Sequence, residues 1–254
     1  MFELTTDILM LLFATALAAS TIDAMAGGGG LLTIPVLMTT GIPPHMVLGT
    51  NKMQAICGTS VATWRYARQG LINWKSIRPA VIAALLGSAL GTIVVQQISA
   101  DFLKPLVPFL LMAMALYFLL SPRLSDQDSH ARIGMMTFAA TFAFGIAFYD
   151  GFFGPGAGSF YTASLLAFLG MNLQRATANT KLLNLSSNMG SLAMFILGGK
   201  VIWLVAAVMI PGQIIGGYCG AHLAMRHGAK LIKPVLVVVS LALSAKLLWA
   251  QFGG

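Results

Sequence analysis

The feature that most constrains this chain is a succession of long apolar segments. Most of them approach the roughly 20 residues that a helix needs to cross a bilayer. The long segments cover approximately residues 5–24, 44–64, 79–98, 105–120, 133–149, 175–197, 202–225 and 234–252, and shorter ones cover 30–40 and 157–169. We therefore predict an all-α, polytopic membrane protein with about eight full-length helices and two short helices that are interrupted or re-entrant.

Composition supports the membrane assignment and excludes several other classes of protein. Hydrophobic residues make up 57% of the chain and charged residues 9%, a balance that a water-exposed surface does not carry. The first segment follows Glu3 and Asp7 rather than basic residues, so we expect a retained helix and not a signal peptide. The net charge of +8 gathers in loops and requires no nucleic-acid partner. Cys57 and Cys219 lie in apolar segments, and we expect neither a disulfide nor a metal site.

The second half of the chain repeats the first at a constant offset of 129 residues. This offset aligns Gly41 with Gly170, Lys52 with Lys181, Gly70 with Gly199, Trp74 with Trp203, Gly87 with Gly216, Gly91 with Gly220, Lys104 with Lys233 and Pro105 with Pro234. Upstream, Asp23 pairs with Asp150 at an offset of 127. We predict a first transmembrane repeat over 1–120, a cytoplasmic linker over 121–132 and a second repeat over 133–254.

Basic residues predict the orientation of the segments, because Lys and Arg are retained on the cytoplasmic side of a membrane. They gather in three loops, with Arg65, Arg68, Lys75 and Arg78 in the first, Arg123 and Arg132 in the second, and Arg226, Lys230 and Lys233 in the third. The opposite loops hold only Lys104 and Lys200. Since each half contains five segments, an odd number, we expect the repeats to be inverted and both termini to lie outside the inner (plasma) membrane.

Glycine clusters precede both short segments, in TIDAMAGGGGLLTIP and in YDGFFGPGAGSF. Non-helical backbone at membrane depth is tolerated only inside protein or beside a wet cavity. We therefore predict that the chain unwinds at Gly27 to Gly30 and again in the second cluster, so that two helix N-termini face an anion bound near Gly28, Gly29, Gly30 and Gly156. The alternative is that these glycines are notches for close helix packing.

Two lysines lie at equivalent positions early in long apolar segments. An ammonium group buried in a bilayer is rare and is a functional hypothesis by default. Helical spacing places two asparagines on the face of the second lysine, and polar residues precede both lysines. We predict a cationic, hydrogen-bonding pocket for a small oxyanion at the midplane. Its predicted members, beside the glycines, are Lys52, Thr50, Asn51, Lys181, Asn179, Thr180, Asn184 and Asn188.

Asp23 and Asp150 each precede a glycine cluster, and several interpretations are open for them. Either could bind and release a proton during transport. Either could equally cap the short helix that follows. Each could also pair with Lys52 or Lys181 for purely structural reasons, and a lysine could instead snorkel to an interface.

The motifs AGGGGLLTIPVLM and LGTNKMQA, with FYDGFFGPGAGSF and ATANTKLLNLSSNMGSLAMFILGGKVIW in the second half, closely resemble the TauE/SafE family of sulfite exporter-like membrane proteins. The resemblance covers essentially the whole chain. It implies a multi-pass inner-membrane protein that moves small sulfur-containing anions, such as sulfite or organosulfonates, with coupling to the proton gradient. The family's motif positions in this chain are Gly27 to Gly30, Asn51, Lys52, Asp150, Gly151, Gly154, Lys181, Asn184 and Asn188.

The leading hypothesis is a secondary transporter that exports a small anion bound between the two repeats. The same pocket would also serve a passive anion channel. An intramembrane enzyme is a weaker alternative, prompted by Tyr149 and Asp150, because the GxGD partner, an HExxH motif and a Ser/His pair are missing. We therefore predict no catalytic residue, no metal and no cofactor. The expected partners are the anion, the lipid bilayer and, in a possible homo-oligomer, further copies of this chain.

Overall fold

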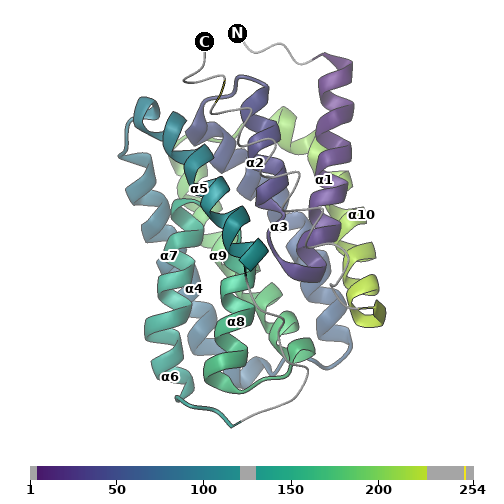
Figure 1. Cartoon of the computed structure of the whole chain (residues 1–254), viewed down its shortest axis with the longest axis vertical. Coiled ribbons are helices and arrows are strands. Elements are labelled where there is room, and N and C mark those ends of the chain that lie inside the picture. Colours follow the sequence, from purple (N-terminus) through teal and green to yellow (C-terminus); the bar gives the residue numbers. More distant parts are fainter. Residues whose placement is uncertain (1–4, 121–129, 228–248, 250–254) are drawn as a thin grey trace.

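The computed structural model describes residues 5–120, 130–227 and 249, and all regular structure within these ranges is helical (Figure 1). The helices are α1 (Thr6–Ala26), α2 (Gly30–Thr39), α3 (Pro44–Arg68), α4 (Trp74–Gln96), α5 (Ala100–Leu120), α6 (Met135–Phe138), α7 (Phe144–Phe152), α8 (Ala157–Leu169), α9 (Leu173–Leu197) and α10 (Trp203–His227). A π-helical turn, Ala139–Ala143, joins α6 to α7 without a break. The prediction of an all-helical fold is confirmed for these residues. The predicted segment 234–252, apart from residue 249, and most of the linker 121–132 lie outside them.

Helix ends follow local chemistry that the sequence carries. The side chains of Thr5, Asn73 and Asn172 accept hydrogen bonds from the first-turn amides of α1, α4 and α9. Gly170 takes a left-handed conformation and ends α8. The helices α4 and α5 begin about five residues earlier than expected, because Pro79 and Pro105 lie inside their opening turns and do not start them.

Four helical stretches are long and apolar enough to cross a membrane: Thr6–Met25, Trp74–Gln97, Met135–Phe152 and Trp203–Met225. In the fold, α1 packs along α10, and α4 packs along α7. The more polar α3 and α9 contact each other and lie against these pairs. Apolar side chains such as Ile82, Leu86 and Leu90 of α4 are exposed, as expected for a surface that faces lipid.

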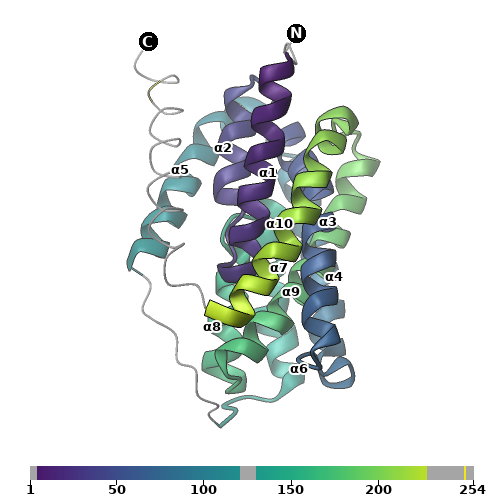
Figure 2. The same ribbon diagram turned by 90° about the vertical axis from the view of Figure 1, so that its right-hand side faces the viewer.

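The two short helices turn back toward the end of the molecule from which the preceding helix came. In Figure 1, α1 descends to about the middle of the molecule and α2 returns upward, whereas α7 ascends and α8 returns downward. The view turned by 90° shows the same arrangement (Figure 2). Glycines with positive φ make both reversals, Gly27 and Gly28 in the first and Gly154 and Gly156 in the second. The short segments therefore re-enter the molecule and do not cross it.

Other glycines act as the packing notches that the alternative interpretation predicts. On α4, a Cβ atom at Gly91 would stand 2.0 Å from the carbonyl oxygen of Phe148 on α7. On α10, a Cβ atom at Gly220 would stand 2.2 Å from the carbonyl oxygen of Thr21 on α1. Gly87 and Gly216, one turn earlier, make corresponding contacts at 2.5 and 2.3 Å. Only glycine allows these backbones to approach so closely.

Basic residues gather at one end of the helices. Arg68 and Lys75 flank the turn between α3 and α4, at the lower end of the molecule in Figure 1. The Arg132 amide donates to the Phe168 carbonyl oxygen at 2.8 Å, which places the start of α6 beside the end of α8. Arg175, which is not among the basic residues that predict the orientation, lies at the start of α9 at the same end. The described basic residues at this end therefore extend the predicted bias.

Candidate functional site

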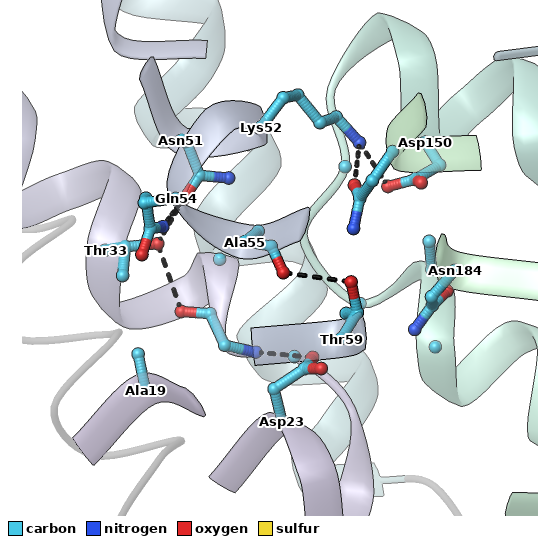
Figure 3. Close-up of a pocket in the computed structure, with 18 of the residues that line it drawn as sticks. Ala19, Asp23, Thr33, Asn51, Lys52, Gln54, Ala55, Thr59, Asp150 and Asn184 are labelled. Carbon is cyan, nitrogen blue, oxygen red and sulfur yellow. Dashed lines mark hydrogen bonds and ion pairs between the residues drawn. The ribbon is translucent and has the colours of Figure 1, made fainter. Parts of the chain in front are cut away.

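A polar cavity lies where the two helix reversals meet α3 and α9 (Figure 3). Its empty volume is about 520 Å³, counting the space at its open mouth. The cavity is lined by Ala19, Asp23, Gly28, Gly29, Gly30, Thr33, Asn51, Lys52, Gln54, Ala55, Thr59, Asp150, Gly154, Gly156, Ala157, Gly158, Asn184, Asn188 and Gln213. Residues from both halves of the chain thus build one site.

The two glycine reversals touch each other at the cavity. A Cβ atom on Gly27 would stand 3.0 Å from the carbonyl carbon of Gly158, and one on Gly30 would stand 3.3 Å from Cα of Pro155. As a result, α2 and α8 both begin at the cavity, and they run from it toward opposite ends of the molecule (Figure 1). The first amides of a helix have no partner within the helix, and this end carries partial positive charge.

Lys52 extends from α3 into the second half of the chain (Figure 3). Its Nζ donates to Asp150 Oδ1 at 2.8 Å and to Asn188 Oδ1 at 3.1 Å. The other carboxylate oxygen of Asp150 accepts from the Ser187 hydroxyl. Lys52 is only 3% exposed, so its charge depends on these partners inside the protein.

Lys181 makes the reciprocal contact with the first half, but with different geometry. Its Nζ lies 3.1 Å from Asp23 Oδ2 and also donates to the Asp23 backbone carbonyl. The remaining oxygen of Asp23 accepts from the Gly29 amide at 3.2 Å, which closes the turn before α2. The Asp23 side chain is 23% exposed and lines the cavity, whereas Lys181 is buried behind it.

The charges of the site differ from the cationic pocket that the sequence suggests. Both lysines pair with a carboxylate of the other half. The lining itself carries one ammonium, from Lys52, and two carboxylates, from Asp23 and Asp150. With all four groups ionised, the site is neutral as a whole, and an anion entering it would meet two carboxylates.

Polar side chains on α2 and α3 form the adjoining wall (Figure 3). Asn51 Oδ1 accepts from the Thr33 hydroxyl at 2.6 Å and from Gln54 Nε2 at 2.7 Å. The side-chain oxygens of Gln54 and Asn184 are buried and have no protein partner. Buried polar atoms normally find a partner in protein or ordered water, so these two oxygens are free to bind water or a ligand.

The structure brings most of the predicted site residues together but not all of them. Those that line the cavity are Lys52, Asn51, Asn184, Asn188, Gly28, Gly29, Gly30, Gly156, Asp23 and Asp150. Thr50 accepts from the Ile202 amide at 3.0 Å, and Thr180 bonds to Thr162 at 3.0 Å. Asn179 lines a separate cavity near Arg175, at the basic end of the helices. Lys181, Thr50, Thr180 and Asn179 therefore do not line the cavity; they contact residues around it or lie away from it.

Sequence reasoning missed Thr33, Ser187 and Gly158. Thr33 contacts Asn51, and 129 residues later Thr162 contacts Thr180. The repeat offset could therefore have identified Thr33 as a residue with an equivalent in the second half. The described residues contain no cluster of His, Cys, Asp or Glu able to hold a metal ion, and both cysteines are free.

Comparison with known proteins agrees with the fold and the motifs. A family model described as sulfite exporter TauE/SafE matches residues 12–247. A "probable membrane transporter protein" of Haemophilus influenzae is 44% identical over 96% of this chain and 96% of the relative. The "probable membrane transporter protein YfcA" of Escherichia coli K12 is 44% identical over 97% of this chain and 91% of the relative. A Bacillus subtilis relative named YunE is 24% identical over 94% of this chain and 97% of its own length. No solved structure matches the chain.

Proposed function

Because the chain belongs to the sulfite exporter TauE/SafE family of membrane transporters, we propose that it is a secondary transporter that exports small sulfur-containing anions, such as sulfite or organosulfonates. We propose further that it works in the inner membrane and that transport is coupled to the proton gradient. One observation carries the proposal: two helix N-termini and the Lys52 ammonium meet in a single cavity.

The chemistry of this cavity suits a small oxyanion. The starts of α2 and α8 carry partial positive charge, which favours an anion. In this structure the Gly29 amide donates to Asp23 and the Ala157 amide to the Gly154 carbonyl oxygen, so those two amides already have partners. Lys52 can supply a charge-assisted hydrogen bond once its carboxylate partner is neutralised or displaced. The unpaired Oδ1 of Asn184 is an acceptor, so it would bind a bridging water or a protonated oxygen of the ligand. Sulfite and sulfonate groups present several oxygens to Lys52 and the helix starts at once.

Reciprocal contacts support an inverted repeat as the basis of transport. Lys52 pairs with Asp150, and its equivalent Lys181 pairs with Asp23. Helix α4 packs against α7, and α10 packs against α1, through glycines that are equivalent in the two halves. In transporters of this design, one repeat rocks against the other around a fixed site at the midplane. The Lys52–Asp150 and Lys181–Asp23 ion pairs each join one repeat to the other. We propose that both pairs rearrange when the cavity changes the side of the membrane to which it opens.

The basic end of the helices supports a cytoplasmic location for that end. Arg68, Lys75, Arg132 and Arg175 lie there among the described residues. Retention of Lys and Arg in the cytoplasm would then leave the N-terminus of α1 on the opposite side. The export direction and the inner-membrane location rest on this orientation together with the family.

A flux experiment tests the function directly. The purified protein would be reconstituted into vesicles with the membrane potential clamped, and sulfite movement would be followed under an imposed pH gradient. We expect sulfite to move against its own gradient, because a coupled carrier converts the proton gradient into an anion gradient. The matched variants are Lys52→Gln, at the cavity, and Lys104→Gln, at an exposed ion pair.

The two variants separate the possible results. Loss of flux in Lys52→Gln, with flux retained in Lys104→Gln, would support the assigned site. Sulfite flux that only dissipates its own gradient would support a passive channel in place of a coupled transporter. Absence of flux for sulfite, thiosulfate, taurine and methanesulfonate would contradict the proposal.

A further inference from the structure

The two equivalent carboxylates of the site are held in different ways. The Asp23 carboxylate is held by backbone as well as by a lysine: its Oδ1 accepts from the Gly29 amide and its Oδ2 lies 3.1 Å from Lys181 Nζ. The Asp23 carbonyl also accepts from Lys181 and from the Gly27 amide. The Asp150 carboxylate is held by two side chains, those of Lys52 and Ser187. A repeat that makes these residues equivalent has thus given them unequal surroundings.

The second reversal is closed by a different bond. The Tyr149 hydroxyl donates to the Pro155 carbonyl oxygen at 2.6 Å, and the Phe153 amide donates to the Tyr149 carbonyl at 2.8 Å. Pro155 itself has no amide hydrogen to be capped. The turn before α8 therefore has its own support, and the Asp150 carboxylate is available for another task. In the first half, by contrast, Asp23 itself closes the turn before α2.

We propose that Asp150, and not Asp23, takes up the proton that is coupled to transport, and that ionised Asp150 competes with the anion for Lys52. This inference rests on the proposed function, since it concerns the same cavity and its anion. When Asp150 is ionised, it occupies Lys52 Nζ at 2.8 Å. When Asp150 is protonated, Lys52 keeps its positive charge and the anion takes the place of the carboxylate. Anion and proton then bind together.

Electrostatics decides between cotransport and exchange. An anion placed beside ionised Asp150 would add a like charge inside a buried site, which is strongly unfavourable. An empty site with Asp150 protonated would leave Lys52 without a counter-charge, which is unfavourable for the same reason. The two favourable states are the empty, deprotonated site and the site that holds both anion and proton. Proton and anion therefore move in the same direction.

Cotransport links the direction of net movement to the charge of the anion. A divalent anion such as sulfite, moving with one proton, carries one negative charge. The inside-negative membrane potential drives that charge outward, whereas a pH gradient with acid outside drives the proton, and the anion bound with it, inward. Export by this cotransport is therefore driven by the membrane potential and the anion's own gradient. A monovalent sulfonate moving with one proton carries no net charge, so only the pH gradient and its own gradient act on it. The membrane potential should thus accelerate sulfite export and leave sulfonate movement unchanged.

The surroundings of Asp150 contain few competing ionisable groups among the described residues. Lys52 reaches it from α3, and Lys181 on α9 is bound to Asp23. The hydroxyl of Tyr149, on its own helix, donates to the Pro155 carbonyl oxygen, and that of Tyr161, on α8, donates to the Ala143 carbonyl oxygen. The ionisable residues of α4, Lys75 and Arg78, lie in its first turns at the basic end, far along the helix from Gly91 at the α7 contact. Lys52 is thus the charge that Asp150 and the anion share.

The test is the pH dependence of sulfite affinity in wild type, Asp150→Asn and Asp23→Asn. Sulfite itself takes up a proton near neutrality, but it does so equally with all three proteins. The ratio of dissociation constants between variants therefore reports only the protein. We expect the wild-type affinity, relative to that of Asp150→Asn, to fall as the pH rises, by up to about tenfold per pH unit. Asp23→Asn should show the same pH dependence as wild type, whatever its overall affinity.

Each outcome bears on the inference. Equal pH dependence in wild type and Asp150→Asn would overturn it, as would loss of the dependence in Asp23→Asn. If wild type bound none of the anions, the proposed function and this assignment would both fall. If Asp150→Asn does not fold, Ser187→Ala takes its place, because this variant removes a hydrogen-bond donor to the ionised Asp150 carboxylate. The pH at which sulfite affinity falls should then differ between Ser187→Ala and wild type. An unchanged value in that variant would overturn the assignment.

Discussion

Gly27, at the end of α1, lies in backbone contact with Gly158, in the first turn of α8. A Cβ atom on Gly27 would stand 3.0 Å from the Gly158 carbonyl carbon and 3.0 Å from the Ser159 amide nitrogen. The contact brings the two reversals of the chain to one level, although the residues are separated by more than half of the sequence. Both helix N-termini can face the same cavity because nothing larger than hydrogen stands between them.

Gly27→Ala should therefore destabilise the protein and abolish anion binding. Gly27 has φ 78° and ψ 164°, a region essentially restricted to glycine, where an alanine costs about 1–3 kcal/mol of folding free energy. Its methyl group would also press on the backbone of α8, which has no flexible atom to move aside. Thermal unfolding in detergent and sulfite titration would measure the two effects.

Gly41→Ala is the matched control for this substitution. Gly41 has nearly the same φ, 79°, but nothing lies within 4 Å of the position of a Cβ atom. We expect Gly41→Ala to lose only the folding free energy that a positive φ costs an alanine, and to keep anion binding. Equal losses in the two variants would show that the contact between the reversals has no importance of its own.

The Lys52–Asp150 pair allows stability and function to be separated. Lys52→Met would leave the Asp150 carboxylate buried without its counter-charge, at a cost of about 3–5 kcal/mol. Replacing both residues, as Lys52→Met with Asp150→Leu, should restore most of the stability, because a buried pair contributes little beyond compensating its own desolvation. Neither variant should bind sulfite. Thermal unfolding and sulfite titration of the two variants would measure this.

An exposed pair provides the comparison. Lys104 and Asp101 are 2.8 Å apart at the start of α5, and both side chains are well exposed. Lys104→Met should leave the thermal midpoint essentially unchanged, because exposed pairs contribute little. If the Lys52→Met and Asp150→Leu double variant still bound sulfite, the anion site would have to lie elsewhere.

The sequence predicted those parts of the site that are anomalous in a membrane. A lysine such as Lys52 in an apolar segment, or a run such as Gly28 to Gly30, has few structural explanations there, so each indicated the cavity that it lines. Helix positions were also predictable within a few residues from the apolar segments alone, as α2 and α8 show.

The remainder of the site depends on packing between helices. Thr50 and Asn179 precede the lysines by two residues, and about 200° of helical rotation turns them away from the cavity. Lys181 binds the backbone of Asp23, a contact that arises only when α9 packs against α1. Thr33 carries no sequence signal by itself, because membrane helices commonly contain threonine bonded to its own backbone.

Equivalent glycines on α4 and α10 test whether the two repeats pack alike. Gly91→Ala and Gly220→Ala would each place a methyl group against a carbonyl oxygen, at 2.0 and 2.2 Å. We expect both to destabilise the protein by about 1–3 kcal/mol, because each helix pair must separate. The measurement is thermal unfolding of each single variant.

Gly145→Ala on α7 is the control for the glycine substitutions. Gly145 is helical and exposed, and nothing lies within 4 Å of the position of its Cβ atom. Alanine there should be neutral or stabilise the helix by up to about 1 kcal/mol. A loss for Gly91→Ala with none for Gly220→Ala would argue against equivalent packing in the two halves.

Single cysteines test the proposed orientation. In a background with Cys57→Ala and Cys219→Ala, Gln69→Cys would lie at the basic end, between α3 and α4, and Ser99→Cys at the other end, before α5. Both positions are exposed, so each should react with a maleimide that reaches it. If the basic end is cytoplasmic, a membrane-impermeant maleimide should label Ser99→Cys in intact spheroplasts but label Gln69→Cys only after the membrane is opened. Labelling of Gln69→Cys alone in intact spheroplasts would show that the basic end lies outside. The sides of the membrane from which α2 and α8 are accessible would then be exchanged.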